Sequence, residues 1–236
     1  MVDSNGEPQV VYHGSRSLDD FFVFDSSKGN PSNQGGHYFS NSKPFALKFG
    51  KNIKELNAQG GQFFSWRFLS KDLWFQSHPY SLSASPSDTS LRITVKALGD
   101  SSTQLAHVKK GTRVFIEGPY GIFKASAAKA GRHIVLIGGG VGITPLRAIM
   151  EEFDPTTQID VLYLASTQEE LVLKDELDEL AKKIGAKVHY LVGSRKDHPI
   201  SYEYLKKVLP NFADTEVFVC GPQPLVDAVK QSAKRA

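Results

Sequence analysis

Short apolar strands alternate with helical patterns through the second half of the chain, and this alternation limits the possible folds more than any other feature. Four runs read as strands: HIVLIG (133–138), DVLYLA (160–165), VHYLV (188–192) and VFVCG (217–221). Because such strands are apolar on both faces and are separated by helices, they predict a parallel sheet covered on two sides. Residues 131–236 are therefore expected to form a doubly wound α/β domain.

Two of the intervening segments have the spacing of amphipathic helices. Apolar side chains between residues 146 and 153, and again between residues 177 and 184, recur at i, i+3, i+4 and i+7. This spacing places them on one face of a helix. Gly185 follows the second pattern, at the point where a helix end favours a residue in the left-handed conformation.

Residues 61–123 have a different texture, rich in aromatic and β-branched side chains. The runs QFFSWRFL, PYSLSAS, LRITVKAL and TRVFIEG are separated by Gly, Pro, Ser and Asp, a pattern typical of short strands joined by turns. Such spacing predicts a small β-barrel or sandwich. We assign residues 53–125 to this domain, residues 123–132 to a linker and residues 1–52 to an atypical N-terminal segment.

Composition excludes several classes of protein. The net charge of +3 is small and no Lys/Arg-rich block occurs, so nucleic acid is not an expected partner. The single cysteine, Cys220, excludes an internal disulfide and a multi-cysteine metal or iron–sulfur site. No apolar run reaches the ~18 residues of a membrane-spanning helix, and the polar start does not resemble a signal peptide. A soluble protein is expected, in the cytoplasm or at the cytoplasmic face of a membrane.

Residues 138–145, GGGVGITP, join an apolar strand to a predicted helix. Thr144 fits the N-cap of that helix and Pro145 its first position. Glycines here would let a pyrophosphate approach the backbone, where free N–H groups and the helix dipole favour negative charge. The motif departs from G-x-G-x-x-G, and an ordinary tight turn is an equal alternative.

The motif CGPQP (220–224) ends the last of the predicted strands. In a parallel sheet this position puts Cys220 at the same carboxyl edge as the glycines, where ligands bind. A small thiol followed by Gly and Pro would let a flat ring lie close to the backbone. A buried core cysteine is the alternative.

Two motifs in the β-rich half offer polar and aromatic groups. In HPYSLSASP (78–86), His78 can donate to a phosphate, Tyr80 has a flat face and Ser81 has a hydroxyl. An edge strand with a half-buried tyrosine would explain the same residues. KALGDSST (96–103) offers N–H groups and hydroxyls after a strand, or a plain hairpin turn.

The order of these motifs is more specific than any one of them. HPYS, VKALGDSS, EGPYG, GGGVGITP and CGP follow one another as in the ferredoxin–NADP⁺ reductase superfamily, which residues 53–235 resemble. The likeness is greatest to the ferric reductase/NADPH oxidase branch, where a His-Pro-aromatic-Ser/Thr motif replaces Arg-x-Tyr-Ser. The resemblance implies a β-barrel that binds FAD, followed by an α/β domain that binds NADPH or NADH, with NADPH favoured.

The resemblance also implies roles for individual residues. Tyr80 would stack on the isoalloxazine, Ser81 would hydrogen-bond near its N5, and Cys220 would lie beside the nicotinamide carbon that gives up hydride. Ser81 and Cys220 would orient the rings rather than act as acids or bases. The other implied FAD contacts are His78, Pro79, Val95, Lys96, Ala97, Gly99, Ser101 and Ser102. The other implied nicotinamide-dinucleotide contacts are Gly139, Gly140, Gly142, Thr144, Ser166, Arg195, Gly221 and Pro222. A solvated loop charge explains Arg195 equally well.

Both ends of the chain depart from that family. The final residues AKRA stand where the family continues into a last strand, so one sheet edge is expected to be incomplete. Residues 1–52 show no pattern for the family's first two barrel strands and resemble the opening of phage-associated, toxin-like ADP-ribosyltransferases. That likeness would assign His13 and Gly14 to NAD binding and Tyr38 to nicotinamide packing. Strand residues that complete the barrel are the preferred interpretation.

Three functions follow from these observations. The first is a flavin-dependent oxidoreductase that passes electrons from NAD(P)H through FAD to ferric iron, haem or an iron–sulfur partner. Its acceptor could be a haem-bearing membrane protein or a small redox protein. The second is an ADP-ribosyltransferase, against which the lack of an assignable catalytic glutamate counts. The third is a non-catalytic nucleotide-binding protein whose barrel no longer retains FAD.

Overall fold

The computed structural model describes residues 57–236 except positions 88, 89, 98 and 110, together with the strand backbone at 21–25, 36–38 and 40–41. The assignments of His13 and Gly14 to NAD binding lie outside these residues, and Tyr38 is described through its backbone alone.

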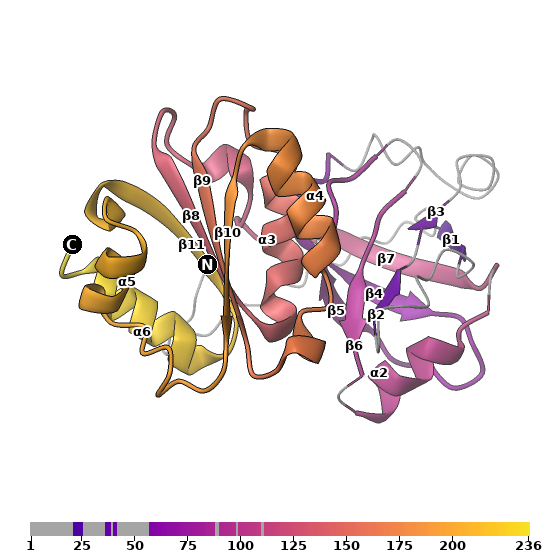
Figure 1. The fold of residues 1–236 in the computed structure, drawn as a ribbon. Coiled ribbons are helices and arrows are strands. Elements are labelled where there is room, and N and C mark those ends of the chain that lie inside the picture. The colour runs from indigo at the N-terminus through magenta and orange to yellow at the C-terminus, as the bar shows by residue number, and fades with distance from the viewer. Residues whose placement is uncertain are drawn as a thin grey trace.

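Four parallel strands form the sheet of the second half, as the alternating pattern predicts (Figure 1). They are β8 (His133–Gly139), β9 (Ile159–Ala165), β10 (Lys187–Val192) and β11 (Thr215–Cys220). Their order across the sheet is β10-β9-β8-β11, so the direction of winding reverses between β8 and β11. Doubly wound sheets bind ligands at the carboxyl ends of the strands beside such a reversal.

Helices cover both faces of this sheet (Figure 1). On the face toward the β-rich half lie α3 (Ile143–Met150) and α4 (Lys174–Ile184), and on the other face lie α5 (Tyr202–Val208) and α6 (Gln223–Ala233). The buried apolar side chains form two clusters accordingly, one on each face. Gly185 ends α4 with φ 72°, the left-handed conformation that its position predicts.

The start of α3 differs from the expectation. Gly142 is its N-cap, and Thr144, expected there, lies in the first turn, where its hydroxyl donates to the Val141 carbonyl at 2.9 Å. The prediction of Thr144 as N-cap is wrong because the turn Gly140–Gly142 is already wound as a 3₁₀ helix (η5) that runs into α3. The helix therefore starts two residues before Pro145.

The β-rich half contains a five-stranded antiparallel sheet of order β3-β1-β7-β4-β5 and a two-stranded sheet of β2 and β6. An isolated bridge between Leu82 and Ile93 connects the end of β5 to the start of β6. The strands are β1 (Phe21–Asp25), β2 (Gly36–Tyr38), β3 (Ser40–Asn41), β4 (Phe63–Phe68), β5 (His78–Ser81), β6 (Thr94–Lys96) and β7 (Arg113–Tyr120).

Two of these strands correct an expectation from the sequence. Residues 1–52 showed no pattern for the first strands of a barrel, yet β1 pairs with β7 and β2 pairs with β6. The strands were missed because they are short and stand beside a Gly/Ser/Asn-rich stretch, so no alternation of apolar and polar residues extends far enough to be recognised. The pairing of β2 agrees with the interpretation of Tyr38 as a strand residue.

The core of the β-rich half is built on β4, which alternates buried and more exposed side chains. Phe64, Trp66 and Phe68 are fully buried, as the period of two in a half-buried strand requires. They pack with apolar side chains from β6 and β7 in one cluster. This core fixes β5 and β6, the two strands that carry the expected flavin contacts.

Shorter helices complete the described chain. They are α2 (Asp100–Gln104) and the 3₁₀ helices η3 (Leu105–His107), η4 (Ala125–Ala127), η6 (Gln168–Glu170) and η7 (Phe212–Asp214). Within the described ranges, none of the helices combines the length and the apolar character needed to cross a bilayer.

Candidate functional site

A pocket of about 600 Å³ lies at the carboxyl edge of the parallel sheet, where the winding reverses. It brings together many of the residues that the sequence predicted to bind a nicotinamide dinucleotide, and one residue from β6 of the other half. The predicted residues that line it are Lys96, Gly139, Gly140, Gly142, Ser166, Arg195, Cys220, Gly221 and Pro222. Hydride transfer from a nicotinamide to a flavin requires the two rings to meet, and a pocket lined by both halves meets this requirement.

The glycines of the loop after β8 are needed for close packing at this edge. A Cβ on Gly142 would overlap the Cys220 carbonyl, lying 2.6 Å from its carbon and 2.9 Å from the Gly221 nitrogen. These are backbone atoms, so no side-chain rotation could make room. Gly142 therefore allows the turn η5 to lie against the end of β11, and leaves the pocket lined by backbone.

Cys220 lies opposite Gly138 in the register between β11 and β8. It is partly buried and packs against the core cluster beneath α3 and α4. Burial raises the pKa of its thiol, so the group remains protonated and uncharged at neutral pH. A neutral, polarisable side chain suits contact with a flat ring, and does not suit a nucleophile.

An ion pair connects the two halves across this pocket. Nζ of Lys96 on β6 lies 2.9 Å from Oε1 of Glu170 in η6, and both residues line the pocket. The other oxygen of Glu170 accepts a hydrogen bond from the Ser166 N–H at 3.0 Å. These bonds from Lys96 and Ser166 lower the pKa of Glu170. Glu170 therefore places an ionised carboxylate, paired with Lys96, beside Ser166, an expected dinucleotide contact.

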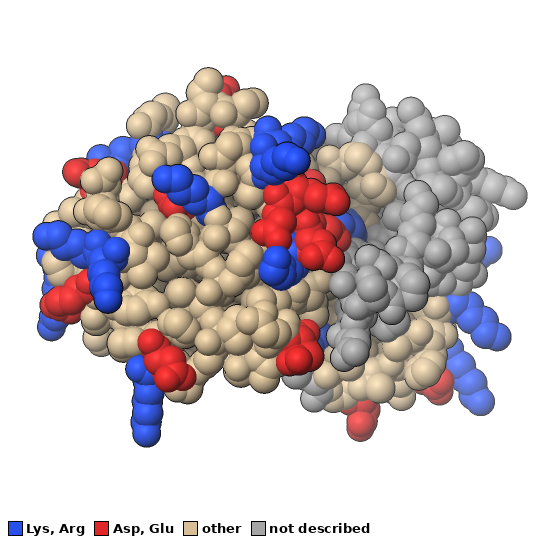
Figure 2. All heavy atoms as spheres, viewed as in Figure 1, with Lys and Arg blue, Asp and Glu red and all other residues tan. Residues whose placement is uncertain are grey.

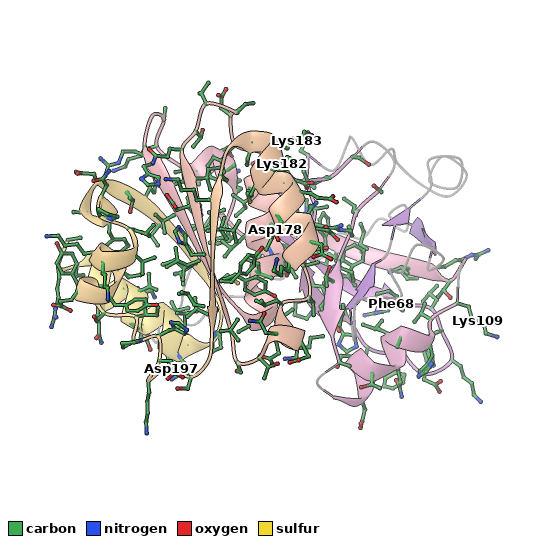
Figure 3. The ribbon with its side chains drawn as sticks, viewed as in Figure 1. Phe68, Lys109, Asp178, Lys182, Lys183 and Asp197 are labelled. Atoms are coloured by element: carbon green, nitrogen blue, oxygen red, sulfur yellow. The ribbon has the colours of Figure 1, made fainter. Side chains whose placement is uncertain are left out.

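The loop after β10 closes another side of the pocket. Asp197, labelled in Figure 3, accepts hydrogen bonds from the Ser194 N–H and hydroxyl at 2.8 and 2.7 Å, and these bonds lower the pKa of its carboxyl. The turn that they stabilise carries Arg195, which lines the pocket. Nε2 of His198 lies 3.1 Å from the Val192 carbonyl, which fixes the end of the loop.

The strand β5 presents Tyr80 as a half-buried ring. The ring stacks against that of His78, with centroids 6.0 Å apart and planes at 30°. The indole N–H of Trp66 donates to the Tyr80 carbonyl at 3.0 Å, which ties the strand to the core. Burial raises the pKa of the Tyr80 hydroxyl and lowers that of His78, so both side chains are neutral at pH 7.

Two buried polar atoms beside this strand point to a ligand. Nε2 of His78 and Oγ1 of Thr94 on the neighbouring β6 are inaccessible to water and have no hydrogen-bond partner among the described residues. Such atoms are costly unless something satisfies them. A cofactor with ribityl hydroxyls and phosphates would supply partners. The residues on β5 and β6 therefore fit a flavin nucleotide.

The other expected flavin contacts take up different positions. Val95 is buried in the barrel core, Lys96 faces Glu170, and Ala97 is exposed. The hydroxyl of Ser102 donates to the Gly99 carbonyl at 2.9 Å, and that of Ser101 donates to Gln76 at 2.6 Å. Pro79 is exposed on β5. Lys96, expected to contact FAD, thus lines the pocket expected to bind the dinucleotide.

Sequence reasoning missed Glu170, although a signal for it was present. An acidic residue shortly after the second strand of a doubly wound sheet is the usual partner of a ribose hydroxyl. Glu170 stands five residues after the end of β9 at Ala165, whereas the resemblance implied Ser166 and Arg195 as the contacts after the strand ends. The pairing with Lys96, 74 residues away in the chain, had no sequence signal.

Two domain models cover most of the chain. Residues 37–124 match the FAD-binding domain, and residues 136–231 match the oxidoreductase NAD-binding domain. The first match starts inside the N-terminal segment, at β2. Both cofactors expected from the sequence are therefore those of the matched domains.

Curated relatives are similar to this chain over much of its length. The probable dihydroorotate dehydrogenase B (NAD⁺) electron transfer subunit of Thermoplasma volcanium is 31% identical over 199 residues, which cover 80% of this chain and 72% of that protein. NADH-cytochrome b5 reductase 1 of Pyricularia oryzae is 29% identical over 183 residues, which cover 70% of this chain and 58% of the relative. The chain spans about half the length of several such relatives, with values of 58, 50 and 49%.

Among solved structures, the FAD/NAD-binding domain of nitric oxide dioxygenase from Vibrio cholerae superposes with a TM-score of 0.75 at 22% identity. The match covers 92% of this chain and 93% of that one. It confirms the expected fold, a barrel-like FAD-binding domain followed by a parallel-sheet NAD-binding domain.

Proposed function

The chain belongs to the ferredoxin–NADP⁺ reductase superfamily of flavin-dependent oxidoreductases, and on this premise we propose that it accepts a hydride from NADH or NADPH and passes electrons to a separate acceptor. The acceptor proposed is a haem or iron–sulfur protein or ferric iron; one relative is named as a cytochrome b5 reductase and one structural neighbour as a ferredoxin reductase. We also propose residues 53–125 and 131–236 as the two functional domains, with residues 1–52 completing the first.

One observation supports this proposal above the others. The pocket at the reversal of the parallel sheet is lined both by the glycine loop and Cys220 and by Lys96 of the flavin-binding half, and β6 lies against the turn η5. Electron transfer between two cofactors requires their sites to adjoin. A binding protein with one nucleotide site would have no need of this arrangement.

On the dinucleotide side, the chain would bind and orient. Backbone N–H groups of the turn η5, at the start of α3, would hold the pyrophosphate. Lys96 would add a positive charge at the same pocket, and Arg195 a second one from the loop after β10. Cys220 and Pro222 would limit how the nicotinamide ring can tilt, because both line the pocket beside the glycine loop.

On the flavin side, Tyr80 would supply a flat face and His78 a neutral donor, while Ser81 would reach the edge of the ring. When bound, NAD(P)H and FAD supply the hydride and one-electron chemistry themselves. The contribution of the protein is to place the two rings, to exclude water and to hold Glu170 and Lys96 paired until a nucleotide enters.

The function is tested by adding each nucleotide to FAD-reconstituted protein without oxygen. We expect the yellow protein to bleach after saturating NADH is added, and to regain its colour when ferricyanide or air is added. Protein that cannot be reconstituted with FAD would support the non-catalytic hypothesis. Release of nicotinamide without bleaching, abolished in His13→Ala and kept in Tyr80→Ala, would support the ADP-ribosyltransferase hypothesis for residues 1–52.

We propose NADH as the preferred nucleotide, contrary to the preference that the resemblance implied. The ionised Glu170 and the ribose 2′-phosphate of NADPH would carry like charges at one pocket, whereas a ribose 2′-hydroxyl could donate to the carboxylate. Substituting Glu170→Gln removes the repulsion and should shift the NADH/NADPH ratio of kcat/KM about tenfold toward NADPH, which corresponds to ~1.4 kcal/mol.

Glu169→Gln is the matched control, because Glu169 is adjacent in sequence, is exposed and does not line the pocket. Its ratio of kcat/KM for the two nucleotides should stay within twofold of the unsubstituted protein. An equal shift in both variants would show that the effect is a general change of charge, and no shift in Glu170→Gln would refute the preference.

A further inference from the structure

Two arginines from the two halves of the molecule share one carboxylate at the border between them. The guanidinium of Arg92, just before β6, lies 2.9 Å from Oε2 of Glu176 on α4, and that of Arg147 on α3 lies 3.0 Å from the same oxygen. Arg147 also pairs with Glu151 at 2.7 Å. The two positive charges thus meet two negative ones.

The same arginines converge on the backbone of one buried serine. Arg92 donates to the Ser83 carbonyl at 2.5 Å and to its hydroxyl at 3.2 Å, and Arg147 donates to that carbonyl at 3.3 Å. Two residues further on, the Ser85 N–H donates to Glu151 at 2.6 Å. We refer to Ser83, Arg92, Arg147, Glu151 and Glu176 as the arginine clamp.

The position of the clamp in the chain connects the two proposed cofactor sites. Ser83 follows the strand β5 that presents Tyr80, and Arg147 lies on the helix whose N-cap is Gly142. Figure 2 shows acidic and basic side chains gathered over α4, at the border with the β-rich half. The exposed part of that group includes Asp178, Lys182 and Lys183, labelled in Figure 3, whereas the side chain of Arg147 is only 10% exposed.

Buried charges are unusual in proteins because removal from water is costly. An apolar residue at position 147 could fill the border between the halves without that cost. The arginine instead donates a hydrogen bond to the serine carbonyl and forms ion pairs with Glu176 on α4 and with Glu151, which follows its own helix. Polar contacts between particular atoms restrict the relative orientation of the segments that they join more tightly than apolar contact does.

We propose that Arg147 is a positioning residue, which holds the dinucleotide-binding edge of α3 in register with the flavin-binding strand β5 through Ser83 and Glu176. The proposal rests on the proposed function. Its consequence is kinetic, because misplacement of reacting groups by about 1 Å can slow a reaction roughly a hundredfold without changing the affinity for either reactant.

The test compares Arg147→Met with the unsubstituted protein in two measurements. In anaerobic stopped flow, we expect the limiting rate of flavin bleaching at saturating NADH to fall at least tenfold, while the Kd values for FAD and NADH change less than threefold. In calorimetry of the cofactor-free protein, we expect one unfolding transition to separate into two, since the clamp couples the halves.

Two further variants keep the test decisive. Glu176→Gln removes the shared negative charge with little change of shape, so it should also lower the limiting rate of bleaching. If Arg147→Met does not fold, this variant tests the positioning role in its place. Arg235→Met removes an exposed arginine that lies 3.7 Å from Glu203 at the far end of the chain, and should change neither measurement.

Failure of this proposal can be told apart from failure of the proposed function. Unsubstituted protein that binds FAD but is never bleached would refute the function, while the calorimetric result would still report on the clamp. An unchanged limiting rate in both clamp variants would overturn the positioning role. So would a loss of FAD or NADH affinity large enough to explain the slower bleaching.

Discussion

Substituting Gly142→Ala should strongly weaken dinucleotide binding while leaving FAD bound. The added methyl group would overlap the backbone at Cys220 and Gly221, so η5 and the end of β11 would have to separate. Overpacking of this kind costs about 1–3 kcal/mol, and we expect the upper end because both neighbours are main chain. The Kd for NADH, measured by titration of the FAD-loaded protein, should rise at least thirtyfold.

Gly185→Ala is the control for the general cost of replacing a glycine. A Cβ on Gly185 would meet nothing within 4 Å, but its φ is left-handed, and an L-residue in that conformation costs about 1 kcal/mol of stability. Its Kd for NADH should not change. If Gly142→Ala binds NADH with unchanged affinity, the glycine loop is an ordinary turn and the dinucleotide site lies elsewhere.

Tyr80→Ala should release FAD, the second large effect expected. The ring of Tyr80 is half-buried and stacks against His78, so truncation removes both a stacking surface and part of the apolar shield. A loss of about 2 kcal/mol is expected from stacking and ring burial, equivalent to roughly thirtyfold in Kd. The Kd is measured by the change in flavin fluorescence on binding to the cofactor-free protein.

Tyr80→Phe separates the ring from its hydroxyl. The phenylalanine keeps the flat face, and the hydrogen bond from Trp66 goes to the backbone carbonyl at this position, which no side-chain change removes. FAD affinity should therefore stay within about threefold. A loss in Tyr80→Phe as large as that in Tyr80→Ala would show that the hydroxyl, and not stacking, binds the flavin.

Local patterns predicted much of the fold. The strand β9 appears in the sequence as the mostly apolar run at 160–165 and in the structure as Ile159–Ala165, because a strand buried on both faces is a nearly continuous apolar run. The helix α4 was predicted from the helical spacing of its apolar residues, and its left-handed end from the position of Gly185. The apolar pattern before Phe153 overran α3, which ends at Met150, although Phe153 still packs in the same core.

Part of the candidate site was also predictable from the sequence and part was not. The edge that carries Gly140, Gly142 and Cys220 was predictable, since carboxyl ends of parallel strands meet at one edge regardless of what separates them in the chain. The orientation of Lys96 toward Glu170 was not predictable. Residues on neighbouring positions of a strand point to opposite faces, and which face meets the other half depends on how the halves dock.

By itself, the sequence determined the alternation of strands and helices in the second half, the two types of domain and the edge that carries the candidate site. These follow from side-chain periodicity and from glycines, both of which act over a few residues. Only the tertiary structure decided that Arg92 and Arg147 share Glu176, that Lys96 pairs with Glu170, and that β1 and β2 join the barrel sheets. Such contacts depend on the docking of segments far apart in the chain. The spacing of residues within a segment does not predict which charged side chains from distant segments will meet.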